Sequence, residues 1–582
     1  MVLLDRLRRR PVCESLCSSA AGLSLLLVAV PLATDFRLGS VGALVHAGTA
    51  LVAVMLHMAA QRTAGELERH QRDPLGTEVE LWTARCLGAG SAVAAVLALC
   101  GVSPSALGTY GALAAATLFL LVNRLRTRVR LALAGATLSE AIFQSPAATI
   151  LRSFAVAILF GALLLSLPIA SATINPVGPI DALFTAASAT CVTGLIVKDT
   201  PVDFSLFGQI TILLLIQVGG LGIMTLAGIF NVARRQRVSL HDRMTLHGTV
   251  SIDEANMSTT LGAIARYTFT LELIGGLALF LRWWLGGEMG PLRAAWVAGF
   301  HAISAFCNAG FSLFSNSLES YSADPAVNLT VCALIIVGGL GFPVIADLRR
   351  YRRDLMGGRR PRLALHTKLV LVTTTALLLL GLVGFLLLEW HEGLLRGGLE
   401  GAYIAGFQSV TTRTAGFNTV PIGRLADATK FLFVLLMFAG ASPGSTGGGI
   451  KTATLAVVAV TGWAMMLGQS RVSIFGRGIP ESARHRAVAV VMLFGLMVLV
   501  WTFLLSMTER MRFMSILFEV TSAFATVGLS TGITARLSAF GRLAITAAMY
   551  LGRVGPLTVA VAVANRQTRV ELEYPDEQVM VG

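Results

Sequence analysis

Charged residues are scarce in this chain. Only 13% of its 582 residues carry charge, against about 25% in an ordinary soluble domain, while 55% are hydrophobic and the mean hydropathy is +0.73. Apolar runs of about 18 residues or more recur along the sequence, which indicates membrane-spanning helices. The composition therefore excludes a string of soluble domains and predicts one polytopic membrane body.

The net charge of +14 is no sign of nucleic-acid binding, because the arginines lie between the hydrophobic runs, where they set orientation in a bilayer. Enzyme and zinc patterns are also missing. The nine histidines show no HExxH spacing, and Cys13 and Cys17 have no second ligand pair. No paired-carboxylate or Ser-His-Asp pattern occurs at membrane depth, so we expect no enzyme and no covalent cofactor. The apolar stretch 22–33 lacks a cleavage motif, so we expect no signal peptide.

The hydrophobic segments fall into two groups. Residues 1–145 hold four segments, near 18–34, 40–60, 84–102 and 107–124, which we expect to be extra N-terminal spans. After them, a unit of spanning helix, shorter glycine-containing stretch and second spanning helix occurs four times. The units are 146–240, 241–362, 363–480 and 481–582, the last with a short C-terminal tail. Their expected helices are 149–170, 205–231, 262–285, 326–346, 368–390, a broken helix at 428–467, 486–507 and 540–563.

The four units align on Gly194, Gly310, Gly416 and Gly528, which lie 116, 106 and 112 residues apart. Ten residues before the glycine stand Phe184, Phe300 and Phe518, although the third unit shifts its phenylalanine to 407. Six residues before it stand Ser188, Ser304 and Ser522, with Val410 in the third unit. Internal repeats in membrane proteins surround a central transport site. The expected fold is therefore all-α, with four helix–pore loop–helix repeats around one pore.

Arginine-rich linkers predict the orientation of the chain. The stretches 234–243, 349–362 and 471–486 each connect one repeat to the next. If all three are cytoplasmic, the glycine loops open on the outer side, and both termini are cytoplasmic. We expect a multi-pass protein of the plasma membrane (the inner membrane of a bacterium), with membrane lipid around it and no nucleic-acid partner.

Non-helical backbone at membrane depth must line a polar cavity, and rings of carbonyls replace the hydration shell of potassium in selectivity filters. Glycine permits the backbone conformations that turn carbonyls inward. The alternative, glycines that only pack helices, fits one loop better than four aligned loops. The predicted potassium ligands are Val192, Thr193, Gly194, Asn308, Ala309, Gly310, Thr414, Ala415, Gly416, Thr526, Val527 and Gly528.

A second glycine-rich segment, 440–452, interrupts a helix of the third repeat. It is no phosphate-binding loop, because Ile450 stands where that motif needs glycine. Its place below the filter predicts a gate in which Arg553 contacts the loop and opposes cations. The alternative is that Lys451 and Arg553 reach the cytoplasmic interface. We also expect Arg413 to brace the filter and to pair with Glu519. The predicted gate residues are Gly444, Ser445, Thr446, Gly447, Gly448, Gly449, Lys451 and Arg553.

Residues 145–582 resemble the Trk/Ktr/HKT superfamily of potassium transporters, and the tail 574–582 resembles the Ktr-type membrane subunit. The motifs are Thr190–Leu195, Phe306–Phe311, Thr412–Asn418, Ser522–Ser530, Gly444–Thr452 and Gly552–Pro556. The resemblance implies potassium uptake, a homodimer with one pore per protomer, and a cytoplasmic ring of nucleotide-binding regulatory subunits. It also implies sodium dependence or symport, and glycine rather than serine at 194 implies selectivity for potassium over sodium.

Three other functions remain open on sequence alone. The chain could transport sodium or an organic ion, act as a membrane enzyme, or sense a partner without ion flux. Ion-dependent growth of a potassium-uptake-deficient host would identify the first. A phenotype that survives Gly310→Asp or Gly416→Asp without flux would identify the third.

Overall fold

The computed structural model describes residues 146–173, 176–236, 257–390, 399–469 and 471–555. The chain divides into two compact units, Met1–Gln144 and Ser145–Gly582, and the described residues belong to the second. The four expected N-terminal spans, Cys13, Cys17 and the C-terminal tail lie outside these residues, so those predictions stay untested.

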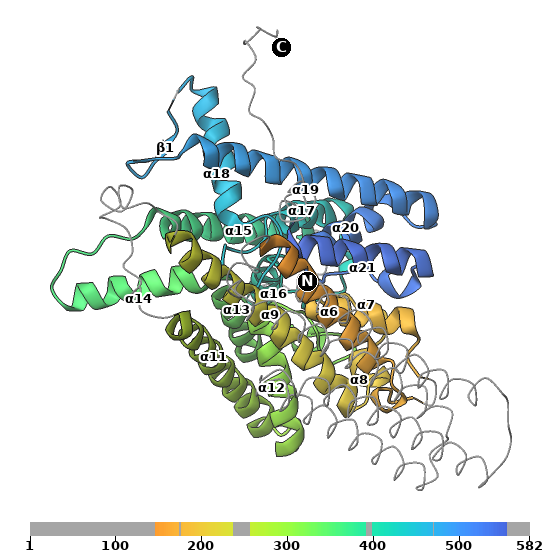
Figure 1. Ribbon diagram of the computed structural model, residues 1–582. Helices are drawn as coiled ribbons and strands as arrows, with labels where there is room; N and C mark the ends of the chain where they lie inside the picture. The colour runs from red at the N-terminus through yellow and green to blue at the C-terminus, as the bar shows by residue number, and fades with distance from the viewer. Residues whose placement is uncertain (1–145, 174–175, 237–256, 391–398, 470, 556–582) are drawn as a thin grey trace, which may run out of the picture. The chain divides into compact units, whose positions relative to one another are not determined.

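The described chain is almost wholly helical, and its helices follow the four expected repeats (Figure 1). In each repeat a long helix leads to a short helix that ends at a glycine loop, and a further helix returns. Repeat 1 holds α6 (Pro146–Leu165), η1 (Pro168–Ala170), α7 (Pro179–Thr190), α8 (Thr200–Asp203) and α9 (Leu206–Gln236). Repeat 2 holds α11 (Met257–Leu285), α12 (Pro291–Cys307), η2 (Glu319–Tyr321), α13 (Pro325–Leu340) and α14 (Phe342–Met356).

The other two repeats have the same order of elements. Repeat 3 holds α15 (Leu365–Glu389), α16 (Leu399–Thr411), η3 (Ile422–Arg424), α17 (Asp427–Phe438) and α18 (Thr452–Met466), followed by a hairpin of β1 (Ser473–Ile474) and β2 (Arg477–Gly478). Repeat 4 holds α19 (Glu481–Thr508), α20 (Phe513–Phe524), η4 (Thr534–Arg536) and α21 (Ala539–Val554). The expected break in 428–467 is confirmed, because α17 ends at Phe438 and α18 begins at Thr452.

Among the described helices, three are long and apolar enough to cross a membrane: Gly262–Leu285, Leu365–Glu389 and Glu481–Thr508. The bent pair α13 and α14 would make a fourth, and shorter apolar helices include Leu151–Leu165, Leu206–Gly222 and Thr452–Met466. The structure therefore supports a multi-pass membrane protein, with several helices shorter than the spans expected from sequence.

Two helices differ from the sequence prediction. The single helix expected over 326–346 is wrong: α13 ends at Leu340, and the chain turns by 95° into α14. Gly341 adopts φ +83° at this turn, and Pro343 follows in the first turn of α14, where its missing N–H costs nothing. The last helix ends at Val554 with Gly555 at φ +91°, and residues 556–563 lie outside the described part.

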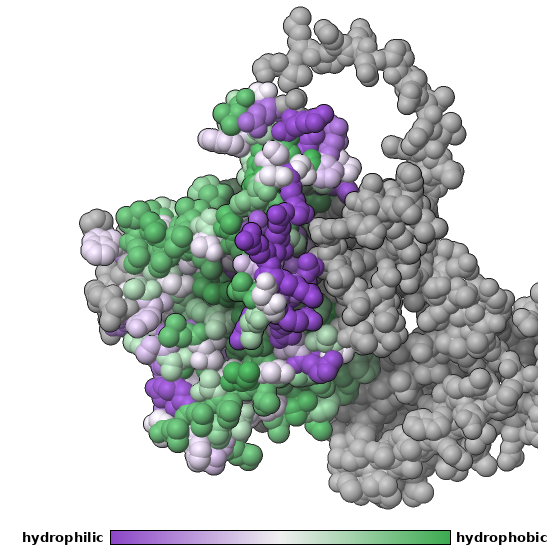
Figure 2. Space-filling view, turned by 90° about the vertical axis from the view of Figure 1, so that its left-hand side faces the viewer, coloured by the Kyte–Doolittle hydropathy of each residue, from purple (hydrophilic) through white to green (hydrophobic). Residues whose placement is uncertain are grey.

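The surface of the described part separates apolar from charged residues. Large side chains on α11, α15 and α19 are exposed, among them Leu273 at 73% and Leu499 at 66%, as expected of helices that face lipid. Figure 2 shows a hydrophilic band across this apolar surface, on the side where α14 and the β1–β2 hairpin lie in Figure 1. Exposed arginines belong to both elements and to the linker between α14 and α15: Arg349, Arg352, Arg353, Arg359, Arg360, Arg362, Arg471 and Arg477.

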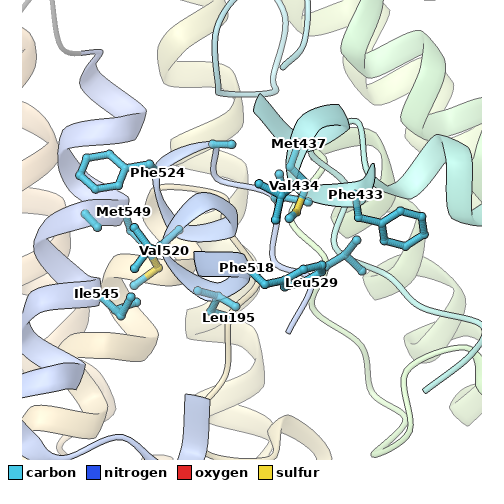
Figure 3. Close-up of a cluster of buried hydrophobic side chains, with 14 of the residues drawn as sticks. Leu195, Phe433, Val434, Met437, Phe518, Val520, Phe524, Leu529, Ile545 and Met549 are labelled. Atoms are coloured by element: carbon cyan, nitrogen blue, oxygen red, sulfur yellow. The ribbon is translucent and has the colours of Figure 1, made fainter. Parts of the chain in front are cut away.

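The core encloses the short helices that lead to the glycine loops. Phe184, Phe300 and Phe518, which are aligned in the sequence, are all completely buried. Figure 3 shows one cluster, in which side chains of α20 and α21 meet those of α17 and two residues that follow filter glycines. Its labelled members are Leu195, Phe433, Val434, Met437, Phe518, Val520, Phe524, Leu529, Ile545 and Met549. This packing fixes the positions of the loops that the short helices carry.

Candidate permeation site

The four glycine loops share one unusual backbone conformation. Gly194, Gly310, Gly416 and Gly528 have φ of +92°, +71°, +83° and +96°. The residue two positions before each glycine is also left-handed, although it carries a side chain, at a cost of roughly 1–2 kcal/mol. These residues are Val192 (+56°), Asn308 (+60°), Thr414 (+69°) and Thr526 (+49°). Because the same strained pattern occurs at four matched positions, the loops are repeats of one structure.

The four glycines meet in a closed ring. A Cβ placed on Gly310 would lie 2.8 Å from the carbonyl oxygen of Ala415 and 2.9 Å from the Cα of Gly416. In the same way, a Cβ placed on Gly416 would lie 2.5 Å from the carbonyl oxygen of Val527 and 3.2 Å from the Cα of Gly528. Each glycine thus touches the carbonyl that precedes the next glycine in sequence.

The ring closes between the fourth repeat and the first. Gly528 lies against the carbonyl oxygen of Thr193, and Gly194 lies against that of Ala309; in both cases a Cβ would also be 3.1 Å from the Cα of the next glycine. No side chain fits at these positions. The four glycines and the backbone carbonyls just before them therefore form one closed ring, with repeats 1, 2, 3 and 4 in order around it.

Hydroxyl groups of the short helices hold the loops in place. Ser188 accepts a hydrogen bond from the N–H of Gly194 at 3.0 Å, and Ser522 accepts one from Gly528 at 3.0 Å. Ser304 instead donates to the carbonyl of Phe311 at 2.8 Å. In the third repeat Thr411, which the sequence did not single out, donates to the carbonyl of Phe417 at 2.5 Å. The aligned serines are thus backbone anchors.

The glycine-rich segment of repeat 3 lies directly against the inner side of this ring. A Cβ on Gly447 would collide with the hydroxyl of Thr414, and one on Gly448 would collide with the hydroxyl of Thr526. Thr446 donates to the carbonyl of Phe306, at the end of α12, at 3.1 Å. The segment thus contacts the loops of repeats 3 and 4 and the end of α12 in repeat 2.

Two cationic side chains hold this segment through its carbonyls. The guanidinium of Arg553, 4% exposed, donates to the carbonyl of Thr446 at 2.5 Å and to that of Gly219 at 2.9 Å. Lys451 donates to the carbonyl of Gly447 at 2.6 Å. The contact of Arg553 with the loop, which the sequence predicts, is present. Arg553 is buried, whereas Lys451 is only partly buried, and the alternative in which both side chains reach the cytoplasmic interface stays a prediction.

The bend between α13 and α14 is tied to the same segment. The N–H of Phe342 donates to the carbonyl of Gly444 at 3.2 Å. The N–H groups of Ser442 and Thr446 donate to the carbonyls of Gly339 and Gly338, at 3.0 and 3.3 Å. A Cβ on Gly341 would lie 2.9 Å from the carbonyl oxygen of Pro443. The left-handed conformation of Gly341 thus brings α14 into contact with the loop.

The expected ion pair between Arg413 and Glu519 is wrong. Arg413 is 7% exposed and donates to the carbonyl of Gly440 at 2.9 Å, at the start of the glycine-rich segment. Glu519 accepts hydrogen bonds from the hydroxyls of Ser530 and Thr534. The sequence alone does not give the direction in which each side chain points around the axis. It therefore could not show that Arg413 and Glu519 have different bonding partners.

Beyond the ring, Asn418 follows Gly416 by two residues and donates to the carboxylate of Glu319 at 2.8 Å. Partial burial raises the pKa of Glu319 above its ordinary value, and the hydrogen bond from Asn418 opposes this shift. An acid thus lies near the glycine loop of repeat 3, on the side that the sequence predicts to be the outer one.

The comparisons with known proteins agree with this geometry. Residues 143–571 match the family model TrkH, described as cation transport protein. The chain belongs to the TrkH family. The resemblance to the Trk/Ktr/HKT superfamily is thereby confirmed, and so are the class of transporter rather than enzyme and the all-α fold.

Relatives of known name match about three quarters of the chain. The Ktr system potassium uptake protein B of Vibrio alginolyticus is 39% identical over 437 residues, which cover 74% of this chain and 94% of the relative. The Ktr system potassium uptake protein B of Bacillus subtilis is 39% identical over 450 residues, which cover 75% of this chain and 97% of the relative. The potassium/sodium uptake protein NtpJ of Enterococcus hirae is 36% identical over 447 residues, covering 75% and 97%.

A solved structure shows the same fold. The potassium transporter TrkH from Vibrio parahaemolyticus superposes with a TM-score of 0.55 and 19% identity, over 71% of this chain and 85% of that chain. The four-repeat arrangement around one axis is consistent with the TrkH family.

Proposed function

We propose that this protein takes up potassium ions across the plasma membrane through the ring of carbonyls at the four filter glycines. The observation that carries the proposal is the closed ring itself, in which each glycine contacts the carbonyl before the next. The names of the relatives, two potassium uptake proteins and one potassium/sodium uptake protein, support the same ion. Potassium here is the transported substrate.

The ring selects by replacing water. A dehydrated potassium ion is stabilised by carbonyl oxygens that take the place of its hydration shell. The three residues ending in each filter glycine provide those oxygens, and the serine and threonine anchors hold them during passage. Side chains of the four loops are not needed as ligands, which agrees with the differing residues Val192, Asn308, Thr414 and Thr526 at one matched position.

The glycine-rich segment acts as the gate in this proposal. It lies beneath three of the loops, and Arg553 and Lys451 place two positive charges where a cation leaves the filter. Conduction therefore requires the segment to move away from Thr414 and Thr526. The mobile element is short and glycine-rich, so it can change conformation without disturbing the packed helices.

Regulation and assembly are further parts of the proposal. The word "system" in the names of the Ktr relatives supports a second component, a cytoplasmic nucleotide-binding subunit. The exposed arginines of α14 and the hairpin offer it a basic surface. A homodimer is expected from the resemblance, and the potassium/sodium relative supports a role for sodium, as activator or symported ion.

Uptake of rubidium into proteoliposomes tests the function. The wild-type protein should take up rubidium and exclude sodium, and Gly194→Ser should lose this preference, because a Cβ there meets the carbonyl of Ala309. Gly178→Ser is the matched control, since nothing lies within 4 Å of a Cβ at that position. Repeating the assay with and without sodium shows whether flux depends on it. Equal uptake of both ions by the wild type would contradict potassium selectivity.

A further inference from the structure

One position behind the filter differs in charge among the repeats. Nine residues before each filter glycine stand Thr185, His301, Phe407 and Glu519, all on the short helices. Thr185 donates to the carbonyl of Asp181 on its own helix, and Phe407 is buried in the core. His301 and Glu519 belong to opposite repeats. Each of them instead forms a hydrogen bond with the serine two residues after its filter glycine, which is Ser312 or Ser530. Of the four side chains, only Glu519 is an acid.

Every hydrogen-bonding partner of Glu519 can donate to its carboxylate. Its two carboxylate oxygens accept from the hydroxyl of Ser530 at 3.1 and 3.0 Å, and one of them also accepts from Thr534. The N–H of Thr531 is a third donor. The N–H of Thr531 can only donate, and the two hydroxyls can donate as well, so this site can stabilise an ionised carboxylate. Its side chain is 1% exposed.

His301 forms the equivalent link without a charge. Its Nδ1 lies 2.8 Å from the carbonyl of Val297, which can only accept, and its Nε2 lies 3.0 Å from the hydroxyl of Ser312. Nδ1 therefore carries a hydrogen. In the neutral imidazole that burial favours, Nε2 then accepts from the serine. Repeat 2 shows that a neutral group suffices to hold the outer segment. The negative charge in repeat 4 is thus not required for that bond.

A buried carboxylate without a cationic partner is costly, since hydrogen bonds alone replace only part of its hydration. In the part of the chain that the structure describes, no lysine, arginine or histidine forms an ion pair with Glu519. Ser530, its partner, lies two residues from Gly528, so their Cα atoms are at most about 7.6 Å apart. The charge therefore lies close behind the ring through which a cation passes.

We propose that Glu519 is the fixed counter-charge of the permeating cation: its carboxylate, held by Ser530, Thr531 and Thr534 behind the fourth loop, stabilises the ion in the outer part of the filter. This inference rests on the proposed function. The interaction is a field across protein with little intervening water, so salt screens it weakly. Glu519 touches no ion in this arrangement and is a positioning residue that raises the local affinity for cations.

The test separates charge from shape with three variants in rubidium uptake. Glu519→Gln keeps the shape and removes the charge, and should raise the KM for rubidium about tenfold, with a smaller change in maximum rate. Glu519→Asp restores the charge and should return the KM to within about threefold of the wild type. Glu509→Gln is the matched control. Glu509 is a buried acid of the same repeat, bonded to Ser538 at 3.2 and 2.5 Å, and its loss should leave the KM unchanged.

A merely structural role would give another pattern. Glu519→Gln and Glu519→Asp would then both lower the amount of folded protein and the maximum rate per cell while the KM stays constant, and that result would overturn the inference. A melting curve of the purified variants separates folding loss from transport loss. If Glu519→Gln does not fold, Glu519→Asp together with Ser530→Ala decides the question. Ser530→Ala keeps the charge, so a KM near that of the wild type supports the proposal, and a tenfold rise overturns it.

The proposed function fails in a different way. If the wild-type protein takes up no rubidium, the ion assignment is wrong, whatever the variants do. If the wild type transports rubidium and Glu519→Gln has an unchanged KM, only the counter-charge is wrong.

Discussion

The four glycine loops and the glycine-rich segment differ in symmetry: all four repeats contribute a loop, but only one repeat contributes the segment. Each of the four repeats contributes a loop of the same backbone conformation to the ring, held by a hydroxyl of its own repeat. The segment comes from repeat 3 alone, and side chains and carbonyls of repeats 2 and 4 hold it. Ion coordination needs symmetry around an axis, whereas a gate has to move past a ring that stays fixed. In the proposed function this segment is the gate, and its place in one repeat lets it move without distorting the other three.

The largest effect is expected in the ring. Gly528→Ala should reduce rubidium uptake at least about a hundredfold, because its φ of +96° disfavours a side chain and the new Cβ would collide with the carbonyl of Thr193. Gly532→Ala is the control, since Gly532 has φ +89° in the same loop with nothing within 4 Å. Comparable uptake by both variants would show that strain alone, and not the ring, governs transport.

A smaller effect of opposite sign is expected in the gate. Arg553→Ala removes a positive charge and two hydrogen bonds from the loop, so the maximum rate of rubidium uptake should rise about tenfold. Arg553→Lys keeps the charge and should stay closer to the wild type. Uptake in proteoliposomes with equal amounts of folded protein is the measurement. An unchanged rate and unchanged gating in Arg553→Ala would remove the barrier role and reduce the contrast between the two regions.

The smallest effect concerns the outer mouth and pH. Because burial raises the pKa of Glu319, its carboxylate takes up a proton at a higher pH than an ordinary glutamate and loses its charge earlier as the outside is acidified. Lowering the outer pH from about 7 to about 5 should reduce uptake at low rubidium about twofold. Glu319→Gln should already show the reduced uptake at neutral pH and no further fall. Glu288→Gln, an exposed outer acid, is the control, and a pH response that persists in Glu319→Gln would exclude this residue.

The sequence predicted the ring because its members repeat. Glycines at matched positions and the serines six residues before them are visible in the letters alone, whereas Thr411 was missed because the third repeat shifts its anchor. The turn at Gly341 was also missed, since the apolar run continues to Ile345 and hides the left-handed glycine within it. The partners of Arg413 and Glu519 could not be derived, because hydropathy gives depth in a membrane and not the angle around its axis.

The bend at Gly341 connects the surface helix α14 to the glycine-rich segment. The arginine-bearing helix α14 begins at Phe342, whose N–H donates to the carbonyl of Gly444, so the first turn of α14 is bonded directly to the glycine-rich segment. A helix of 15 residues is about 22 Å long, and a force applied at its far end acts on that first turn with a long arm. We therefore expect that a regulatory subunit of the proposed kind, bound to the exposed arginines of α14, would act on the glycine-rich segment through this helix and not by contact with the ring itself.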